Sequence, residues 1–380
     1  MTSMDTQCAR TIRIENGTEA AVDLTRPVAR YTHNPILTPR GVNGVWTGPA
    51  HTVVTVHNAG VVRAGDETVM VFRSHLRSGV SILGLARSAD GLTNWRIDPE
   101  PFMRPATTDD RFAESADPAA IVEAEQGGVE DPRIHQFGEY FALTYSAYHG
   151  RVPNRVRVCL ATTTDFRTVV RHGPVLHADM RNVVLFTKPF GGRYAALFRI
   201  NDESAGDVGG AFTRIRIAYA DDWQRGPWDV SDRVLMQTGG GPSAFQAKIG
   251  PGAPPIETDR GWLNIFHGVR TTMDGNPYVL GVALHDRQNP ERVRMCTIPI
   301  LFPSRADCRV DEDQYVHVPN VVFTCGALRR DDGAIVIYYG GNDTVMNVGF
   351  THEDVLVELC ERFGEDPGTG ISPAAAERPG

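Results

Sequence analysis

The sequence predicts an all-β protein, and specifically a five-bladed β-propeller. Strand-like runs of alternating apolar residues fill most of the 380-residue chain, and 38 glycines and 25 prolines separate them. A unit of two hairpins also recurs five times, with almost no convincing helix between the copies. A large β-sandwich or a pair of barrels is the alternative architecture.

Each copy of the repeated unit begins with a hairpin whose second strand is rich in aromatic residues and ends in a polar one. These first hairpins span residues 61–75, 133–148, 183–200, 254–269 and 325–343. A second hairpin follows each, at residues 80–98, 155–173, 214–232, 278–301 and, more weakly, 345–359. Five units of four strands predict a propeller, because radial closure protects the sheet edges that so many hairpins would otherwise expose.

The remaining segments lie outside this repeat. We expect residues 1–30 to form an N-terminal arm or a strand that completes the last blade, residues 31–362 the propeller, and residues 363–380 a flexible tail. Residues 104–128 interrupt the first two units. Within this insertion, residues 117–125 predict a short helix with Asp117 as its N-cap and Pro118 at its first position.

The composition excludes several classes of function. A net charge of −8 argues against a nucleic-acid or membrane surface as the main partner. No segment approaches the roughly 20 apolar residues of a membrane span, and the first residues do not read as a signal peptide. The cysteines at positions 8, 159, 296, 308, 325 and 360 form no C-x-x-C pair, which predicts reduced thiols, no metal site and a cytoplasmic protein.

Polar residues recur at corresponding places in the five units. In a propeller such positions converge on the central channel, however far apart they lie in the sequence. Each one alone is most simply a solvated or hydrogen-bonded turn residue, but together they are rich in cations and suit an anionic substrate. The set is Asn58, Arg73, Asp131, Arg133, Arg181, Asn182, Arg199, Lys248, His267, Tyr278 and Asp343.

The stretch "VEDPR" places an acidic pair at the start of a buried strand. Glu130 and Asp131 are adjacent, so in an extended segment they are expected to face opposite sides, with Pro132 holding Asp131 extended. Arg133 is expected to pair with a carboxylate or a neighbouring blade. One dedicated carboxylate is too few for an inverting glycosidase, which needs an acid and a base, but is enough when phosphate is the nucleophile.

Four motifs together resemble the mannoside phosphorylases of glycoside hydrolase family 130. They are "GGVEDPRI", "RNVVLF", "GAPPIETDRGWLNIFHGV" and "YYGGNDT", and the resemblance covers roughly residues 30 to 360. It implies a five-bladed propeller that needs no metal or cofactor and uses inorganic phosphate as co-substrate. It also implies that Asp131 is the general acid, which acts through the mannose 3-hydroxyl while phosphate attacks the opposite face and yields α-mannose 1-phosphate with inversion.

The resemblance also assigns binding residues and an assembly. The family's mannose contacts correspond to Asn58, Arg73 and Asp343, and family members assemble as dimers to hexamers. The phosphate-binding positions correspond to Arg181, Asn182, Arg199, Lys248, His267 and Tyr278. We therefore expect an inverting β-mannoside phosphorylase, a glycosyltransferase-type enzyme that acts on short β-mannoside oligosaccharides.

Two alternatives remain open. Glu257 stands where some relatives have lysine, and a few family members are hydrolases that use glutamates to activate water, so an inverting β-mannosidase is the first alternative. The second is a sugar-binding or scaffold propeller without catalysis. Because the basic positions of the family are intact here, phosphorolysis is the favoured interpretation.

Overall fold

The computed structural model describes residues 8–14, 18–152, 155–176, 178–200, 213–238, 243–273 and 275–367. In this part of the chain strands predominate, and the α-helices are α1 (Pro39–Asn43), α2 (Pro118–Ala124) and α3 (Glu353–Phe363). The all-β class predicted from the sequence is therefore confirmed. None of the described helices is long and apolar enough to cross a membrane.

The first sheets contain the N-terminal half of the chain. A two-stranded sheet pairs β1 (Arg10–Arg13) with β2 (Glu19–Val22). A nine-stranded sheet contains β4 (His57–Ala64), β5 (Glu67–His75), β6 (Ser81–Ser88), β7 (Arg96–Ile97), β8 (Arg111–Phe112), β9 (Gly128–Phe137), β10 (Tyr140–Tyr148), β11 (Val156–Thr163) and β12 (Val170–Pro174). One parallel pair, Ser81 with Gly128, joins the antiparallel group β4–β7 to the group β9–β12.

Three further sheets follow along the chain. A four-stranded sheet contains β13 (Met180–Leu185), β14 (Tyr194–Ile200), β15 (Arg214–Ala220) and β16 (Asp229–Gln237). A six-stranded sheet contains β17 (Lys248–Pro251), β18 (Ile256–Thr258), β19 (Gly261–Val269), β20 (Tyr278–His285), β21 (Val293–Cys296) and β25 (Gly364–Glu365). The last sheet contains β22 (Val322–Arg329), β23 (Ala334–Gly341), β24 (Val345–His352) and β3 (Ala29–Arg30).

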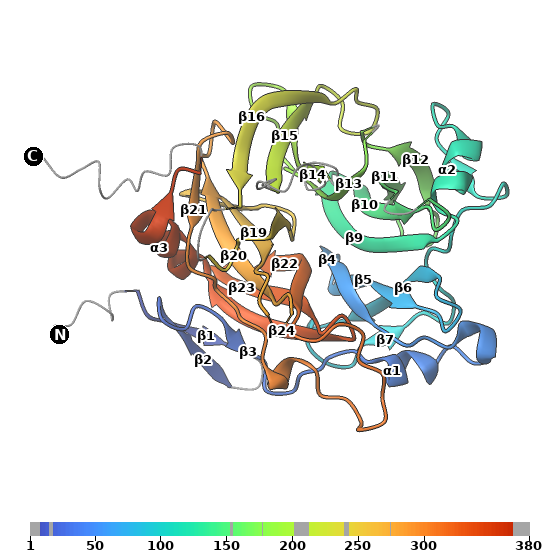
Figure 1. Ribbon diagram of the computed structural model, residues 1–380, viewed down its shortest axis with the longest axis horizontal. Helices are drawn as coiled ribbons and strands as arrows, with labels where there is room; N and C mark the ends of the chain where they lie inside the picture. The colour runs from blue at the N-terminus through green and yellow to red at the C-terminus, as the bar shows by residue number, and fades with distance from the viewer. Residues whose placement is uncertain are drawn as a thin grey trace, which may run out of the picture.

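The strand groups surround a common centre (Figure 1). Strand β4 contacts β9, β9 contacts β13, β13 contacts β17, and β22 contacts both β19 and β4. At four of these five junctions the first strand of one group therefore neighbours the first strand of the next, and at the fifth β22 neighbours β19, the partner of β17. This arrangement is β-propeller-like, and the count of five blades stays a prediction.

The second strands of the last two large groups are buried on both faces. Strands β19 and β23 are buried at every position, because each has neighbouring strands at its edges and side chains packed over both faces. Such strands read as nearly continuous apolar runs instead of alternating ones. The largest hydrophobic cluster extends from Ile12 through Val348 to Leu356, so it joins the N-terminal hairpin to α3.

One predicted helix is confirmed, and one predicted hairpin contains a helix instead. Helix α2 is confirmed, with Asp117 Oδ1 accepting from the Ala120 amide at 3.2 Å. The predicted second hairpin at 345–359 is wrong in its second half, because α3 begins at Glu353. Its N-cap is His352, whose Nδ1 accepts from the Asp354 amide, and its apolar residues recur with helical spacing and pack on β20 and β21.

The ends of the chain join existing sheets. Strand β3 pairs with β24, and β25 pairs with β21, two residues beyond the predicted end of the propeller at 362. Residues 1–7 of the predicted arm and 368–380 of the predicted tail lie outside the described residues.

Candidate active site

Three inner strands carry the same irregularity near the centre. In β4, β9 and β13 a β-bulge places an extra residue opposite the partner strand. Each bulge contains a residue with left-handed backbone: Asn58 at φ 47°, Asp131 at φ 49° and Asn182 at φ 61°. Asn and Asp adopt this conformation more readily than other residues with a Cβ. The bulges therefore turn three polar side chains out of the strand alternation.

The bulge in β9 builds the acidic part of the site. Asp131 Oδ1 accepts hydrogen bonds from Asn58 Nδ2 and from Arg73 Nη1, both at 2.9 Å. Glu130 Oε1 accepts from Arg73 Nη2 and from Ser81 Oγ, both at 2.8 Å. Both carboxylates thus bind the same guanidinium group, and both are buried.

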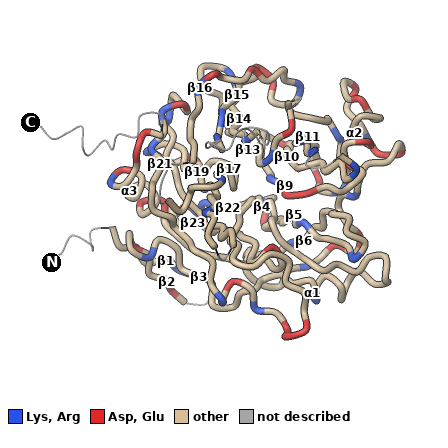
Figure 2. Tube along the Cα trace, viewed as in Figure 1, with Lys and Arg blue, Asp and Glu red and all other residues tan. Residues whose placement is uncertain are grey.

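The expectation that Glu130 and Asp131 face opposite sides is wrong, and so is the expectation that Asp131 is extended. The left-handed backbone at Asp131 breaks the alternation of the strand. Pro132, which has no N–H to donate to the ladder, lies within the same bulge opposite β10. The acidic and basic positions of β9 consequently lie together near the centre (Figure 2).

Two carboxyl groups of the site prefer different protonation states. Burial raises the pKa of Asp131, but the positive charges of Arg73 and Arg133 and the hydrogen bond from Asn58 outweigh it, so the net pKa is lowered. Burial raises the pKa of Asp343 to about 7, and Arg73 only partly opposes this shift. The neighbouring protein groups therefore favour an ionised Asp131, while Asp343 titrates near neutral pH.

Arg133 joins three strand groups at the centre. Its side chain is 1% exposed. Its Nη1 donates to the Asp131 carbonyl at 2.8 Å, its Nη2 to Asn182 Oδ1 at 3.0 Å, and its Nε to the Gly252 carbonyl at 2.9 Å. The sequence predicted a carboxylate or a neighbouring blade as its partner, and the neighbouring strand groups are what it binds.

A cationic cluster, defined as Arg181, Arg199 and Lys248, lies beside Arg133. Arg181 and Arg199 are cross-strand partners in β13 and β14. Burial and then Arg181 lower the pKa of Arg199 to about 10, and burial, Arg199 and Arg181 lower the pKa of Lys248. Within the described part of the chain no carboxylate pairs with any of the three. Neighbouring cations without a carboxylate partner among the described residues are costly, so the cluster suits an anionic ligand.

His267 and Tyr278 form one wall of the cationic cluster. Their rings stack with centroids 6.0 Å apart and planes at 21°. Burial and then Arg199 lower the pKa of His267 well below its usual value, so its imidazole is neutral at neutral pH. A Cβ at Gly250 would lie 2.6 Å from His267 Cε1 and 2.9 Å from Asn182 Nδ2, so only glycine lets these side chains meet.

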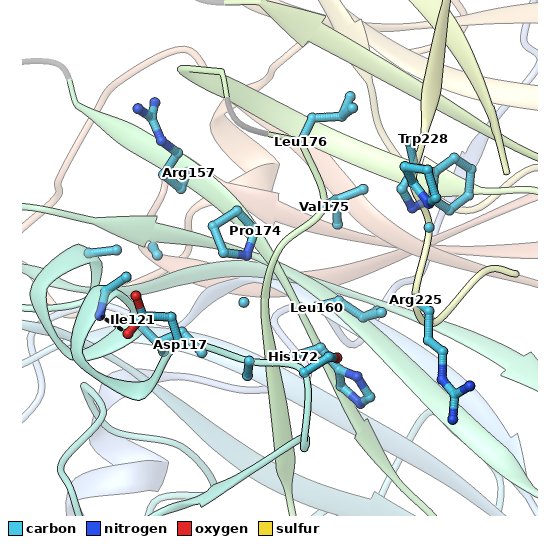
Figure 3. A pocket seen from close by; sticks show the side chains of 18 of the residues that line it. Asp117, Ile121, Arg157, Leu160, His172, Pro174, Val175, Leu176, Arg225 and Trp228 are labelled. Carbon is cyan, nitrogen blue, oxygen red and sulfur yellow. Dashed lines mark hydrogen bonds between the residues drawn. The ribbon is translucent and has the colours of Figure 1, made fainter.

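A cavity of about 460 Å³ opens beside these residues. Lys248 and Tyr278 line it together with Asn276 and Asn320. A separate cavity of about 650 Å³ lies between α2, β11, β12 and residues 224–228 (Figure 3). None of the residues that the sequence assigns to the site lines this second cavity.

The structure brings the ten assigned residues to one region, although their roles stay predictions. Asn58, Arg73 and Asp131 are directly hydrogen-bonded, and Arg133 links them to Asn182. The other assigned residues influence one another's ionisation; they are Arg181, Arg199, Lys248, His267, Tyr278 and Asp343.

Sequence reasoning missed three histidines beside Arg73. The ring centroids of His57 and His75 are 5.4 Å apart, and those of His75 and His317 are 4.8 Å apart. The spacing of Arg73 and His75 was a usable signal, because residues two apart on a strand share a face. His317 lies in the segment before β22, and no sequence pattern indicated that this segment reaches the site.

Glu257 does not lie among the site residues. It forms a salt bridge of 2.5 Å with Lys188. Within the sheet it pairs with Trp262 of β19, five residues from His267 and therefore roughly 17 Å along the strand. The structure gives no support to Glu257 as the base of a hydrolase.

Comparison with known proteins identifies the family. The model of glycoside hydrolase family 130, described as beta-1,4-mannooligosaccharide phosphorylase, matches residues 27–362. The 1,2-β-oligomannan phosphorylase of a Thermoanaerobacter species is 30% identical over 84% of this chain and 95% of its own length. The β-1,4-mannooligosaccharide phosphorylase of Ruminococcus albus is 29% identical over 87% of this chain and 90% of its own.

A solved structure supports the fold. The β-1,2-mannobiose phosphorylase of Listeria innocua, in complex with β-1,2-mannobiose, superposes with a TM-score of 0.71 at 24% identity over 88% of this chain and 99% of that one. This likeness shows a shared β-propeller-like fold. From the family match and the curated relatives named as phosphorylases, the chain belongs to glycoside hydrolase family 130 and is an enzyme of the glycoside phosphorylase type.

Proposed function

We propose that the protein is an inverting β-mannoside phosphorylase built on a five-bladed propeller. It cleaves the terminal β-mannosyl linkage of a short oligosaccharide with inorganic phosphate and releases α-D-mannose 1-phosphate. One observation carries the proposal: a buried carboxylate, Asp131, which is hydrogen-bonded to Arg73, lies in the same region as a cationic cluster that has no carboxylate partner among the described residues.

The cationic cluster is the proposed phosphate site. Arg181, Arg199 and Lys248 supply charge, and Asn182, His267 and Tyr278 supply polar groups around it. Burial, and then mutual repulsion, lower the pKa values of Arg199 and Lys248, and a bound phosphate would offset that repulsion. Because phosphate is already anionic, it needs no base to activate it, which agrees with the distance of Glu257 from these residues.

Asp131 is the proposed general acid, and Asn58, Arg73 and Asp343 are the proposed mannose contacts. An acid must first hold a proton, whereas the cations around Asp131 favour its ionised form. Phosphate adds negative charge beside the same cations, and nearby negative charge raises the pKa of a carboxyl group. In the proposed mechanism, bound phosphate therefore loads Asp131 with the proton that passes through the mannose 3-hydroxyl to the leaving oxygen.

Proton uptake tests the loading step. Phosphate titrated into the enzyme in buffers of different ionisation enthalpy should reveal protons taken up on binding. Asp131→Asn should bind phosphate with less proton uptake, because the group that gains the proton is gone. Equal uptake by both proteins would contradict the loading step.

The location and assembly complete the proposal. The six cysteines are free thiols, which supports a reducing, cytoplasmic location. The proposed reaction uses inorganic phosphate as co-substrate and no cofactor. Ile298, Phe302 and Phe363 are 44%, 56% and 40% exposed, and the Thr297 amide donates to the Phe363 carbonyl. Exposed apolar residues on neighbouring segments support a homo-oligomer, which light scattering would measure.

The central experiment follows cleavage of β-1,2- and β-1,4-mannobiose and mannosyl-glucose with and without phosphate. We expect phosphate-dependent release of α-mannose 1-phosphate, and phosphate release in the reverse direction with one preferred acceptor. Asp131→Asn should lower kcat by about 10²- to 10⁴-fold. Equal cleavage without phosphate would replace the proposal with hydrolysis, and saccharide binding without turnover would favour the sugar-binding alternative.

A further inference from the structure

Arg73 has a third partner besides the two carboxylates. His75 follows it by two residues in β5, so the two side chains share one face of the strand. Nη2 of Arg73 lies 2.8 Å from Nε2 of His75, and the same nitrogen donates to Glu130. Both hydrogens of this nitrogen therefore have an acceptor.

The hydrogen bond from Arg73 determines which ring nitrogen of His75 carries hydrogen. A guanidinium group only donates, so Nε2 of His75 must be the bare, accepting nitrogen. A neutral imidazole then carries its hydrogen on Nδ1, which lies 3.1 Å from Thr55 Oγ1. The same oxygen accepts from the His75 backbone amide at 3.0 Å, so Thr55 fixes both the ring and the strand.

The surroundings keep His75 neutral. His57 and His317 face its ring, and Arg73 adds positive charge on the same side, while Asp131 opposes them. Burial, followed by Arg73 and His317, lowers the pKa of His75 to about 3. The accepting form therefore persists across the neutral pH range.

We propose that His75 is a positioning residue: with its hydrogen on Nδ1, it fixes Nη2 of Arg73 and, together with Glu130, keeps that guanidinium in place while Asp131 gains and loses a proton. This inference rests on the proposed role of Asp131. Protonation of Asp131 removes one of the negative charges that hold Arg73. Glu130 and His75 do not depend on that proton, so they preserve the geometry of Arg73 through the cycle.

The kinetic test compares an apolar and an accepting replacement. His75→Phe removes the acceptor, and we expect kcat to fall about 10- to 100-fold, as for a small misplacement of a reacting group. His75→Gln offers an amide oxygen to Arg73 and should restore most of the loss. KM for phosphate should change little in either variant, because the cationic cluster does not contact His75. Equal kcat for wild type and His75→Phe would overturn the inference.

A matched control separates positioning from folding. His285 is a fully buried histidine, and its Nδ1 lies 2.7 Å from the Pro290 carbonyl, away from Arg73. His285→Phe should lower thermal stability without changing kcat per folded molecule. If His75→Phe and His75→Gln lost kcat equally while both stayed folded, hydrogen-bond acceptance by residue 75 would be refuted.

The wild-type protein offers an independent readout. Nitrogen-15 spectra of the histidine rings should show His75 with a protonated Nδ1 and a bare Nε2 at neutral pH. A protonated Nε2 would overturn the inference whatever the variants do. Failure of the proposed function would look different. A wild-type enzyme that cleaves β-mannosides without phosphate would contradict the phosphorylase proposal, but the expected His75 spectrum would not change.

Discussion

Asp131 and Asp343 belong to one site but hold protons with different strength. At the residue scale this difference comes from their neighbours: Asp131 binds Arg73 and Asn58 directly, whereas burial dominates at Asp343. Such divergence between neighbouring titratable groups is typical of catalytic sites. In the proposed mechanism it separates Asp131, which gains its proton when phosphate binds, from Asp343, which already holds a proton at mildly acidic pH.

Asp343 should make stability depend on pH. The pKa of an unfolded aspartate is about 4, so a folded-state pKa of about 7 means that the folded protein binds this proton more tightly. The contribution is fully present below about pH 4 and is lost as the pH rises through about 7. Relative to Asp343→Asn, the wild type should therefore lose stability over this interval in urea unfolding. Asp331→Asn, on an exposed turn, is the control that should track the wild type.

Residue types were more predictable than their orientation. The recurrence of Asn58, Asp131 and Asn182 was visible in the sequence, and the family motifs named most of the cations. The orientation of Glu130 was not, because strand alternation predicts opposite faces and only the left-handed backbone at Asp131 overrides it. His75 was missed because its function depends on Arg73, whose direction is set by Glu130 and Asp131.

At the element scale, hairpins were easier to predict than the elements that close the sheets. Strong alternation and turn residues located the first hairpins, and capping chemistry located α2. Helix α3 was missed because Val355, Leu356 and Val357 also suit a strand, although His352 and the acids after it have the pattern of a helix start. The pairing of β3 with β24 joins segments more than 300 residues apart, and it agrees with one of the two expectations for residues 1–30, a strand that completes the last blade.

The insertion at 104–128 depends on a buried ion pair. Glu125 accepts from Tyr145 Oη and Arg171 Nη1, both at 2.6 Å, and from the Ala106 amide at 2.9 Å. Glu125→Ala leaves Arg171 buried without its partner, so we expect a loss of about 3–5 kcal/mol in the free energy of unfolding. Glu114→Ala, in the same insertion but at an exposed position, should change it by less than about 0.5 kcal/mol. Equal effects in denaturant unfolding would contradict this account.

At the scale of the whole molecule, the site is a junction between strand groups. Arg133 binds the backbone or side chains of β9 and β13 and the segment after β17, and the cationic cluster spans β13, β14 and β17. A ligand bound there contacts several groups at once. Binding to the folded state alone raises its stability, by about 2.7 kcal/mol at a hundred times Kd.

Phosphate should therefore raise the temperature of unfolding. We expect a larger rise in phosphate than in chloride of equal ionic strength, measured by thermal melting. Lys248→Ala should lose most of the difference, because the proposed site loses a cation. Lys188 pairs with Glu257 instead, so Lys188→Ala should keep the difference between phosphate and chloride. A phosphate effect of the same size in both variants would place the bound anion elsewhere.

The pairing of Lys188 with Glu257 and the lowered pKa of Lys248 also determine how this protein reacts with amine reagents. The chain contains only these two lysines, and a lowered pKa leaves more of the Lys248 amine neutral and nucleophilic at a given pH. Coupling the enzyme to a support or a dye through its lysines would therefore consume an amine of the cationic cluster. Attachment through a side chain other than lysine or arginine would leave the cationic cluster unmodified. Coupling with phosphate present should protect the Lys248 amine in the same way.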